Sequence, residues 1–252
     1  MTDPARVALV TGAGSGIGRA SALALARRGF AVVAAGRRVE LLDSVAATIV
    51  AEGGRALAVP CDVSDEQQVS RLFAQVSSEF DRIDVLFNNA GGNVGRGLVS
   101  ELSLADWNRV LAVNLTGAFL CAREAFRMMA TQSPGGGRII NNGSLSAHVP
   151  RPASVAYTVS KHGITGLTKQ LALDGRRHGI ACGQIDVGNA ATQGSGASAH
   201  SREQPDGSML PEATITPEAV ADAVVYMADL PLDVNILTLT VMATTIPYVG
   251  RG

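Results

Sequence analysis

The chain has 252 residues, of which 46% are hydrophobic and 17% are charged, and its formal net charge is -1. This balance is typical of a globular protein and excludes disorder over the whole chain. The near-neutral charge, with no run of more than two basic residues, argues against nucleic acid as a partner.

Nothing in the chain predicts insertion into a membrane or export. No stretch comes near the roughly eighteen uninterrupted apolar residues of a spanning helix, and residues 1–6 do not resemble the start of a signal peptide. The cysteines Cys61, Cys121 and Cys182 are far apart, so we predict buried thiols in a reducing compartment. We therefore expect a cytoplasmic protein with one domain over residues 1–252.

Short apolar runs alternate with longer helical patterns along the whole chain. The clearest helix is predicted over residues 65–80, where apolar residues recur at helical spacing behind an acidic first turn. Strands that alternate with helices imply right-handed crossovers. We expect a doubly wound, three-layer α/β sandwich with a seven-stranded parallel sheet, the Rossmann architecture. The predicted strands are residues 7–10, 31–35, 56–59, 85–87, 138–141, 181–186 and 236–242.

A glycine-rich turn follows the first predicted strand and opens a helix. Its glycines match the spacing Gly-x-x-x-Gly-x-Gly rather than G-x-G-x-x-G. Glycines let the backbone approach a pyrophosphate, and free amides at a helix N-terminus attract its charge. Such turns also occur without a ligand, but this position favours a nucleotide. The predicted contacts are Gly12, Ser15, Gly16, Ile17 and Gly18.

The end of the second predicted strand bears on the choice of cofactor. NAD-selective proteins usually present a carboxylate to the ribose 2′-hydroxyl at this point, and this chain has none. Arg37 and Arg38 can pair with a 2′-phosphate, so NADP(H) is predicted over NAD(H), unless the two arginines only solvate a helix start. After the third strand, Asp62 either accepts a hydrogen bond from the adenine amino group or caps the next helix.

Tyr157 and Lys161 are four residues apart, which places both on one face if the segment is helical. A tyrosine phenol keeps its proton near neutral pH unless a neighbouring cation stabilises the phenolate, and Lys161 is placed to be that cation. Ser144, from another element, could hold a carbonyl oxygen beside the phenol. The pair alone is weak evidence, because Tyr-x-x-x-Lys occurs by chance in many helices.

Residues 188–216 are rich in Gly, Ala, Ser, Thr and Pro and lack a convincing period. A long irregular stretch in a compact domain is usually a lid, a binding loop or a poorly ordered segment, and we predict a substrate loop.

His148 follows Ser144 by four residues and is either a substrate contact or a surface histidine. No histidine or cysteine pair has ligand spacing, so no metal is predicted.

Several short motifs occur in order along the chain: 11–18, 61–63, 88–91, 113–115, Ser144, and Tyr157 with Lys161. With these motifs the chain resembles the short-chain dehydrogenases/reductases with a single-domain Rossmann fold, over essentially its whole length. The resemblance implies an NAD(P)-dependent oxidoreductase that interconverts a small-molecule ketone and a secondary alcohol. Tyr157 would be the general acid or base, Ser144 would polarise the oxygen, and Lys161 would stabilise the phenolate and hold the nicotinamide ribose.

The resemblance implies further contacts and an assembly. Asn114 would hold a water that links Lys161 to solvent, and a homodimer or homotetramer is expected. Val187-Gly188 replaces the family's usual Pro-Gly, which removes a fixed φ angle beside the nicotinamide site. Residues 235–252 lack the family's common Asp-Gly-Gly ending, which in relatives often builds a subunit interface or borders the substrate pocket. The implied cofactor contacts are Val63, Asn89, Ala90, Gly91, Val187 and Thr192, in addition to Asp62, Tyr157 and Lys161.

Two other functions remain compatible with the sequence. The fold could serve a noncatalytic NADP-binding redox sensor or regulator. Loss of Tyr157 or Lys161 would have favoured that interpretation, and both residues are present. Within enzymes, a lyase or an epimerase on the same scaffold is the weaker rival.

Overall fold

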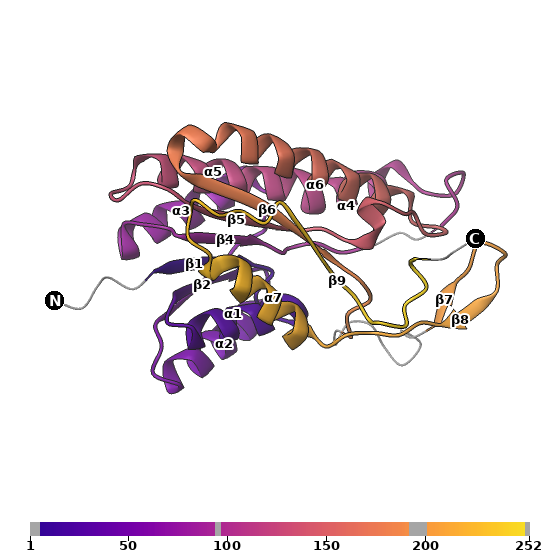
Figure 1. Cartoon of the computed structure of the whole chain (residues 1–252), viewed down its shortest axis with the longest axis horizontal. Coiled ribbons are helices and arrows are strands. Elements are labelled where there is room, and N and C mark those ends of the chain that lie inside the picture. Colours follow the sequence, from indigo (N-terminus) through magenta and orange to yellow (C-terminus); the bar gives the residue numbers. More distant parts are fainter. Residues whose placement is uncertain (1–5, 94–96, 192–200, 250–252) are drawn as a thin grey trace.

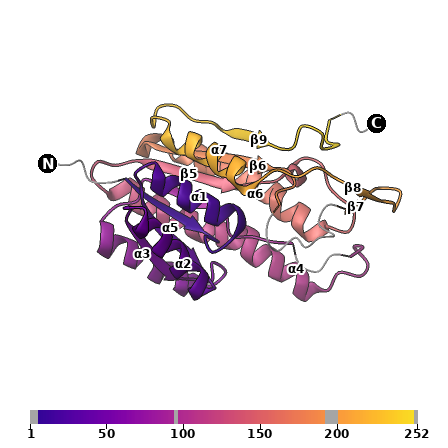
Figure 2. The same cartoon turned by 90° about the horizontal axis from the view of Figure 1, so that it is seen from below.

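A seven-stranded parallel sheet forms the centre of the molecule (Figures 1 and 2). The computed structural model describes residues 6–93, 97–191 and 201–249. Its strand order is β3-β2-β1-β4-β5-β6-β9, so the order reverses between β1 and β4. The predicted strands and the Rossmann architecture are confirmed, with ends shifted by one or two residues. The strands are β1 (Val7–Thr11), β2 (Ala31–Gly36), β3 (Ala56–Pro60), β4 (Val85–Asn88), β5 (Gly137–Asn142), β6 (Ile180–Val187) and β9 (Thr238–Val241).

Helices cover both faces of the sheet (Figure 1). Side chains of α1 (Gly16–Arg27), α2 (Val39–Ala51) and α7 (Pro217–Asp229) belong to the core on one face. On the other face lie α3 (Glu66–Phe80), α5 (Ala118–Thr131) and α6 (Val155–Asp174). In the described residues, no helix is both long and apolar enough to span a membrane. The remaining helical elements are α4 (Leu104–Leu111), which runs through a π-helical turn (Ala112–Gly117) into α5, and two 3₁₀ turns (Leu145–Ala147 and Arg176–His178).

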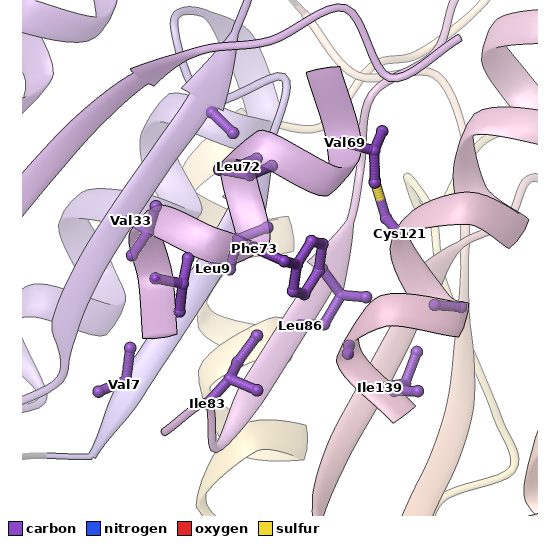
Figure 3. Close-up of a cluster of buried hydrophobic side chains, with 14 of the residues drawn as sticks. Val7, Leu9, Val33, Val69, Leu72, Phe73, Ile83, Leu86, Cys121 and Ile139 are labelled. Atoms are coloured by element: carbon purple, nitrogen blue, oxygen red, sulfur yellow. The ribbon is translucent and has the colours of Figure 1, made fainter. Parts of the chain in front are cut away.

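Alternation along the strands divides the core into two layers. Successive strand side chains point to opposite faces, so Val7 and Leu9 enter the layer beneath α3 and α5, whereas Ala8 and Val10 enter the other. Figure 3 shows the first layer, with Phe73 of α3 packed among strand side chains. A sheet buried on both faces explains why the strands are continuous apolar runs.

The helix predicted over residues 65–80 is confirmed as α3. Asp65 is its N-cap, and its Oδ1 accepts hydrogen bonds from Gln67 N (2.9 Å) and Gln68 N (3.1 Å). The helix ends at Asp81, whose left-handed φ of 56° terminates the hydrogen-bonding pattern. The alternative that Asp62 caps this helix is therefore wrong, because Asp65 performs that role.

The segment predicted to be irregular contains a small antiparallel hairpin. Strands β7 (Ser201–Glu203) and β8 (Met209–Pro211) pair with each other and extend beyond the main sheet (Figure 1). Gly207 turns the chain with a φ of 83°. Strands of three residues are too short to produce a detectable period, which explains why the sequence did not predict them. Residues 192–200 of this segment lie outside the described residues, and its role as a substrate loop stays a prediction.

Candidate active site

A cleft of about 800 Å³ opens at the carboxyl ends of the strands. Residues that directly follow β1 to β6 line it, on either side of the point where the strand order reverses. His148 is not among its lining residues, and Thr192 lies outside the described residues. The predicted site residues that line the cleft are Gly12, Ser15, Gly16, Ile17, Gly18, Arg37, Arg38, Asp62, Val63, Asn89, Ala90, Gly91, Asn114, Ser144, Tyr157, Lys161 and Val187.

The glycine turn is shaped by its backbone. Gly12 and Gly16 have positive φ angles of 66° and 52°, which residues with a side chain rarely adopt. A Cβ on Gly18 would lie 2.8 Å from the carbonyl carbon of Gly12, so only glycine fits there. The turn leads into the N-terminus of α1, whose first turn carries no acidic residue. This arrangement presents backbone amides to an anion such as a pyrophosphate.

The loop after β4 is tied to the glycine turn. Thr11 Oγ1 accepts hydrogen bonds from Asn89 N (2.9 Å) and Ala90 N (3.0 Å). The Asn89 side chain donates to Thr11 O (2.9 Å), and it accepts from Asn142 Nδ2 (3.0 Å). Side-chain hydrogen bonds therefore hold the ends of three neighbouring strands together beneath the cleft.

Two arginines lie at the end of β2. Arg37 and Arg38 are exposed and line the cleft, and Arg38 Nη2 donates to Ser15 Oγ (2.6 Å) on the glycine turn. Asp62 lines the cleft beyond them, after β3. Its Oδ1 accepts from Ser64 N (3.0 Å) and Ser64 Oγ (2.7 Å). These contacts fix the loop after β3 and orient the carboxylate.

Tyr157 and Lys161 lie on successive turns near the start of α6, as their spacing predicted. Lys161 is 6% exposed, and its Nζ lies 5.5 Å from the centre of the Tyr157 ring. The same Nζ donates a hydrogen bond to Asn142 O (2.6 Å). The end of β5 thus holds the ammonium group beside the phenol, in a place where few water molecules can screen it.

Ser144 begins the 3₁₀ turn that follows β5. Its Oγ accepts a hydrogen bond from Ser146 N (3.1 Å), and its backbone N donates to Asp186 Oδ1 (3.0 Å). Since a hydroxyl can accept and donate at once, the Ser144 proton remains able to bind an oxygen in the cleft.

Asn114 lies in the π-helical turn between α4 and α5. Its side chain accepts from Gly92 N (2.9 Å) and donates to Gly92 O (2.9 Å) and Ser160 Oγ (3.2 Å). Ser160 Oγ in turn donates to Tyr157 O (2.7 Å). Asn114 therefore links the loop after β4 to the helix that carries the tyrosine, and the water relay stays a prediction. Single π turns occur frequently at functional sites.

Sequence reasoning missed Asp186, a fully buried carboxylate near the end of β6. Its Oδ1 accepts from Ser144 N and from Gln184 Nε2 (2.6 Å), and its Oδ2 lies 2.7 Å from His148 Nε2. The structure thus gives His148 a protein partner, while its predicted substrate contact stays a prediction. A carboxylate inside a mainly apolar strand was the signal that could have identified this position.

The two asparagines that end β5 differ in environment. Asn141 is fully buried, where it accepts from Asn88 Nδ2 (3.0 Å) and donates to Thr168 Oγ1 (2.9 Å). Asn141 is thus a strand residue in a buried polar network. Asn142 lines the cleft. Together these amides fasten β4, β5 and α6 directly behind Ser144.

Burial limits the reactivity of the cysteine thiols. Burial, together with the charges of Asp62 and Asp65, raises the pKa of the Cys61 thiol to about 11, so it stays protonated at neutral pH. All three cysteines are free and buried, as predicted. Within the described ranges, no three His, Cys, Asp or Glu side chains are grouped in a way that could hold a metal ion.

The fold and the cleft define a Rossmann-type α/β protein with a glycine turn and a Tyr-x-x-x-Lys pair in one site. The model of the short chain dehydrogenase family matches residues 6–203. The chain therefore belongs to this family, and the predictions of the family and of an enzyme are confirmed.

Individual relatives support the same assignment. A 3beta-hydroxysteroid dehydrogenase from Mediterraneibacter gnavus is 41% identical over 180 residues, which are 71% of this chain and 64% of that protein. A cis-4-hydroxycyclohexanecarboxylate dehydrogenase from Sinomonas cyclohexanicum is 38% identical over 229 residues, covering 88% of this chain and 89% of that protein. Among solved structures, a metagenomic short-chain oxidoreductase in complex with NADP is 32% identical, with a TM-score of 0.80 over 95% of this chain and 97% of its own.

Proposed function

We propose that this protein is an NADP(H)-dependent oxidoreductase that interconverts a secondary alcohol and a ketone. The observation that carries the proposal is the presence of Ser144, Tyr157 and Lys161 in the same cleft as the glycine turn. The cleft fits a dinucleotide because the glycine turn and the N-terminus of α1, with its free backbone amides, line it. When bound, a nicotinamide ring supplies or accepts the hydride.

The side chains of this protein would manage the proton. In reduction, the Tyr157 phenol donates its proton to the carbonyl oxygen, and in oxidation the phenolate accepts the proton of the alcohol. Lys161, held by Asn142 O, stabilises the phenolate. Ser144 donates a hydrogen bond to the same oxygen and fixes its position while charge develops on it.

A preference for NADP(H) over NAD(H) is supported by the end of β2. Arg37 and Arg38 line the cleft there, and in the described structure Asp62 is the sole carboxylate among the lining residues. Asp62 follows β3 rather than β2, so it is not where an NAD-selective carboxylate usually lies. Two guanidinium groups suit a 2′-phosphate better than a 2′-hydroxyl. The dissociation constants of NADPH and NADH, measured by fluorescence titration, test this preference.

The relatives name different alcohols, so they do not select one substrate for this chain. Oxidation of cyclic and linear secondary alcohols with NADP⁺, followed by the absorbance of NADPH, tests the reaction. Turnover of any of these alcohols supports the oxidoreductase. A lyase or an epimerase would turn over without net NADPH formation.

The variant Tyr157→Phe tests the mechanism. It should lower kcat by about 10²- to 10⁴-fold, because the general acid is lost, and should leave NADPH affinity unchanged. Tyr226→Phe, at a 60% exposed tyrosine on α7, is the matched control and should leave both unchanged. Wild-type carbonyl reduction by Tyr157→Phe would refute the mechanism, and cofactor binding without turnover in the wild type would favour the noncatalytic sensor.

We also propose a cytoplasmic homodimer or homotetramer. Apolar side chains exposed on α4, α5 and α6 support assembly, namely Leu104 (73%), Phe119 (46%) and Val159 (41%). Light scattering should give two or four times the chain mass of 25.9 kDa. The free thiols suit a reducing compartment, which fractionation of cells tests.

A further inference from the structure

The 3₁₀ turn that follows β5 is held at both of its ends by one carboxylate. Ser144 begins the turn and His148 ends it, with His148 N donating to Leu145 O at 3.0 Å. Asp186 Oδ1 accepts from Ser144 N at 3.0 Å, and Asp186 Oδ2 lies 2.7 Å from His148 Nε2. The two oxygens of a single side chain on β6 thus fasten the first and the last residue of the turn that carries the serine.

The chain provides the space that this carboxylate needs. Asp186 is fully buried, and a Cβ on Gly143 would clash with its Oδ1, so a glycine at position 143 lets the carboxylate reach Ser144 N. Leu145, inside the turn, belongs to the same buried apolar cluster as Ile246. Polar contacts to β6 and apolar contacts to the last part of the described chain therefore fix the turn together.

The two nitrogens of the His148 ring have different surroundings. A carboxylate only accepts hydrogen bonds, so Nε2 donates to Asp186 Oδ2. Within the described residues Nδ1 has no hydrogen-bond partner, and the side chain is 39% exposed. His148 is not among the residues that line the cleft. The ring is therefore placed to hold Asp186 rather than to bind a substrate.

The contact with His148 is the one that Oδ2 of Asp186 makes in the described structure. Oδ1 accepts from two amide groups, whereas Oδ2 has only the histidine ring as its partner. Arg151, which follows His148 closely in the chain, is instead paired with Glu212 at 2.7 Å. Loss of the ring would leave a buried carboxylate oxygen without a donor, which is unfavourable away from water. We expect the carboxylate to rotate in response and to draw Oδ1 away from Ser144 N.

We propose that His148 is a positioning residue, which keeps the Ser144 hydroxyl in place through Asp186. This inference rests on the proposed oxidoreductase function, in which Ser144 donates to the reacting oxygen. Ser144 Oγ accepts from Ser146 N inside the same turn at 3.1 Å, so a shift of the turn moves the hydroxyl. A misplacement of about 1 Å can cost up to about 100-fold in rate, and we expect loss of the His148 contact to lower kcat by about tenfold.

Glutamine and asparagine variants separate the two ring nitrogens. The amide nitrogen of glutamine is as many bonds from Cβ as Nε2 of histidine, and that of asparagine is as many as Nδ1. His148→Gln should therefore keep the contact to Asp186 and hold kcat within about twofold of the wild type, whereas His148→Asn should lose about tenfold. The dissociation constant of NADPH should stay unchanged in both variants. His162→Asn, at an exposed histidine whose Nδ1 contacts Thr158 O of its own helix, is the matched control and should leave kcat unchanged.

The same two variants decide between a positioning role and a substrate contact. A substrate contact through Nδ1 of His148 would be kept by asparagine and lost by glutamine, which reverses the expected order. An asparagine variant as active as the wild type would overturn the inference. A glutamine variant no more active than the asparagine variant would overturn it as well.

A double-mutant cycle tests whether His148 acts through the serine. Ser144→Ala removes the hydroxyl but keeps the backbone N–H that Asp186 binds. In that background His148→Asn should lower kcat by less than about twofold, because the group that it positions is already absent. A further loss of about tenfold would show that His148 acts on another part of the site, against the inference.

Hydrogen exchange follows the Ser144 amide without any turnover. The Ser144 N–H, observed by NMR, should exchange at least about tenfold faster in His148→Asn than in the wild type and should stay protected in His148→Gln. Equal protection in all three proteins would refute the positioning role and leave the oxidoreductase intact. Absence of turnover in the wild type, together with the expected exchange pattern, would refute the proposed function and leave the contact between His148 and Asp186 intact.

Discussion

The two walls of the cleft are built by different means. At the glycine turn, the shape is set by backbone conformation, with positive φ angles at Gly12 and Gly16 and a close backbone approach at Gly18. At the serine loop after β5, the shape is set by buried side chains, since Asp186 holds Ser144 N from the neighbouring strand. One site thus combines a wall that local sequence encodes with a wall that exists only after distant strands have paired.

The side-chain wall is part of a continuous network. Hydrogen bonds run from Asn88 to Asn141, then through Thr168 and Gln184 to Asp186. Every member is buried, and a buried polar group that loses its partner costs about 1–3 kcal/mol. This wall should therefore respond to substitutions at some distance from the reacting atoms.

Gly18→Ala should produce the largest effect, because it changes the backbone conformation of the glycine turn directly. The new Cβ would meet Gly12 and lie 2.5 Å from Asn89 Nδ2, so the turn must shift and NADPH affinity should fall by about 100-fold or more. Gly166→Ala, on α6 with no neighbour within 4 Å, is the control and should stabilise the protein by up to about 1 kcal/mol. Unchanged affinity in Gly18→Ala would show that the turn does not bind the pyrophosphate.

Asp186→Ala tests the side-chain wall. It leaves Ser144 N without its acceptor and removes one of the two acceptors of Gln184 Nε2. We therefore expect kcat to fall by about tenfold or more while the dissociation constant of NADPH stays constant. Asp186→Asn keeps an oxygen acceptor and should recover most of kcat. Equal losses in kcat and in cofactor affinity would indicate general unfolding rather than a displaced serine.

Arg38→Gln tests the cofactor end, where a side chain supplements the backbone wall. Loss of a charge-assisted contact to the 2′-phosphate should weaken NADPH binding by about tenfold, corresponding to roughly 1.5 kcal/mol, with little change for NADH. Titration with both cofactors measures the ratio of the dissociation constants of NADPH and NADH. If both affinities fell alike, Arg38 would act by holding Ser15 rather than by selecting NADP(H).

The smallest effect is expected at Glu212 and depends on pH. Burial alone would raise the pKa of its carboxyl, but hydrogen bonds from Asn189 and Arg151, together with the charge of Arg151, outweigh burial and hold the pKa below its usual value. The ionised carboxylate of Glu212 therefore stabilises the fold at pH values above about 4.3, the pKa of a glutamate in the unfolded chain. This stabilisation is lost as the pH falls through the lower pKa that Glu212 has in the folded protein.

Glu212→Gln should accordingly lower Tm at pH 7 by about 2–4 °C, the equivalent of roughly 1 kcal/mol. The difference from the wild type should narrow as the pH falls below about 4, because the carboxylate of the wild type becomes protonated. Thermal melts of both proteins at several pH values measure this difference in Tm. A difference in Tm that stayed constant down to pH 3 would contradict an ionic role for the Glu212 carboxylate.

Much of the fold could be predicted from the sequence, because its signals are local. The runs that became β1 and β2 are apolar over consecutive residues, as strands buried on both faces must be. The apolar periodicity of α3 and the spacing of the glycines after β1 are likewise signals carried by residues close together in the chain. By contrast, β7 and β8 were not predicted, because three-residue strands are stabilised by pairing with each other.

The candidate site divides in the same way. The glycine turn and the Tyr157–Lys161 spacing can be recognised in the sequence alone, since φ angles and helical periodicity are properties of short segments. The partners of Ser144, Asn114 and Arg151 are instead set by the tertiary structure. Those partners, among them Asp186 and Glu212, lie tens of residues away in the chain, and burial brings them together because a polar group removed from water requires another to bond with.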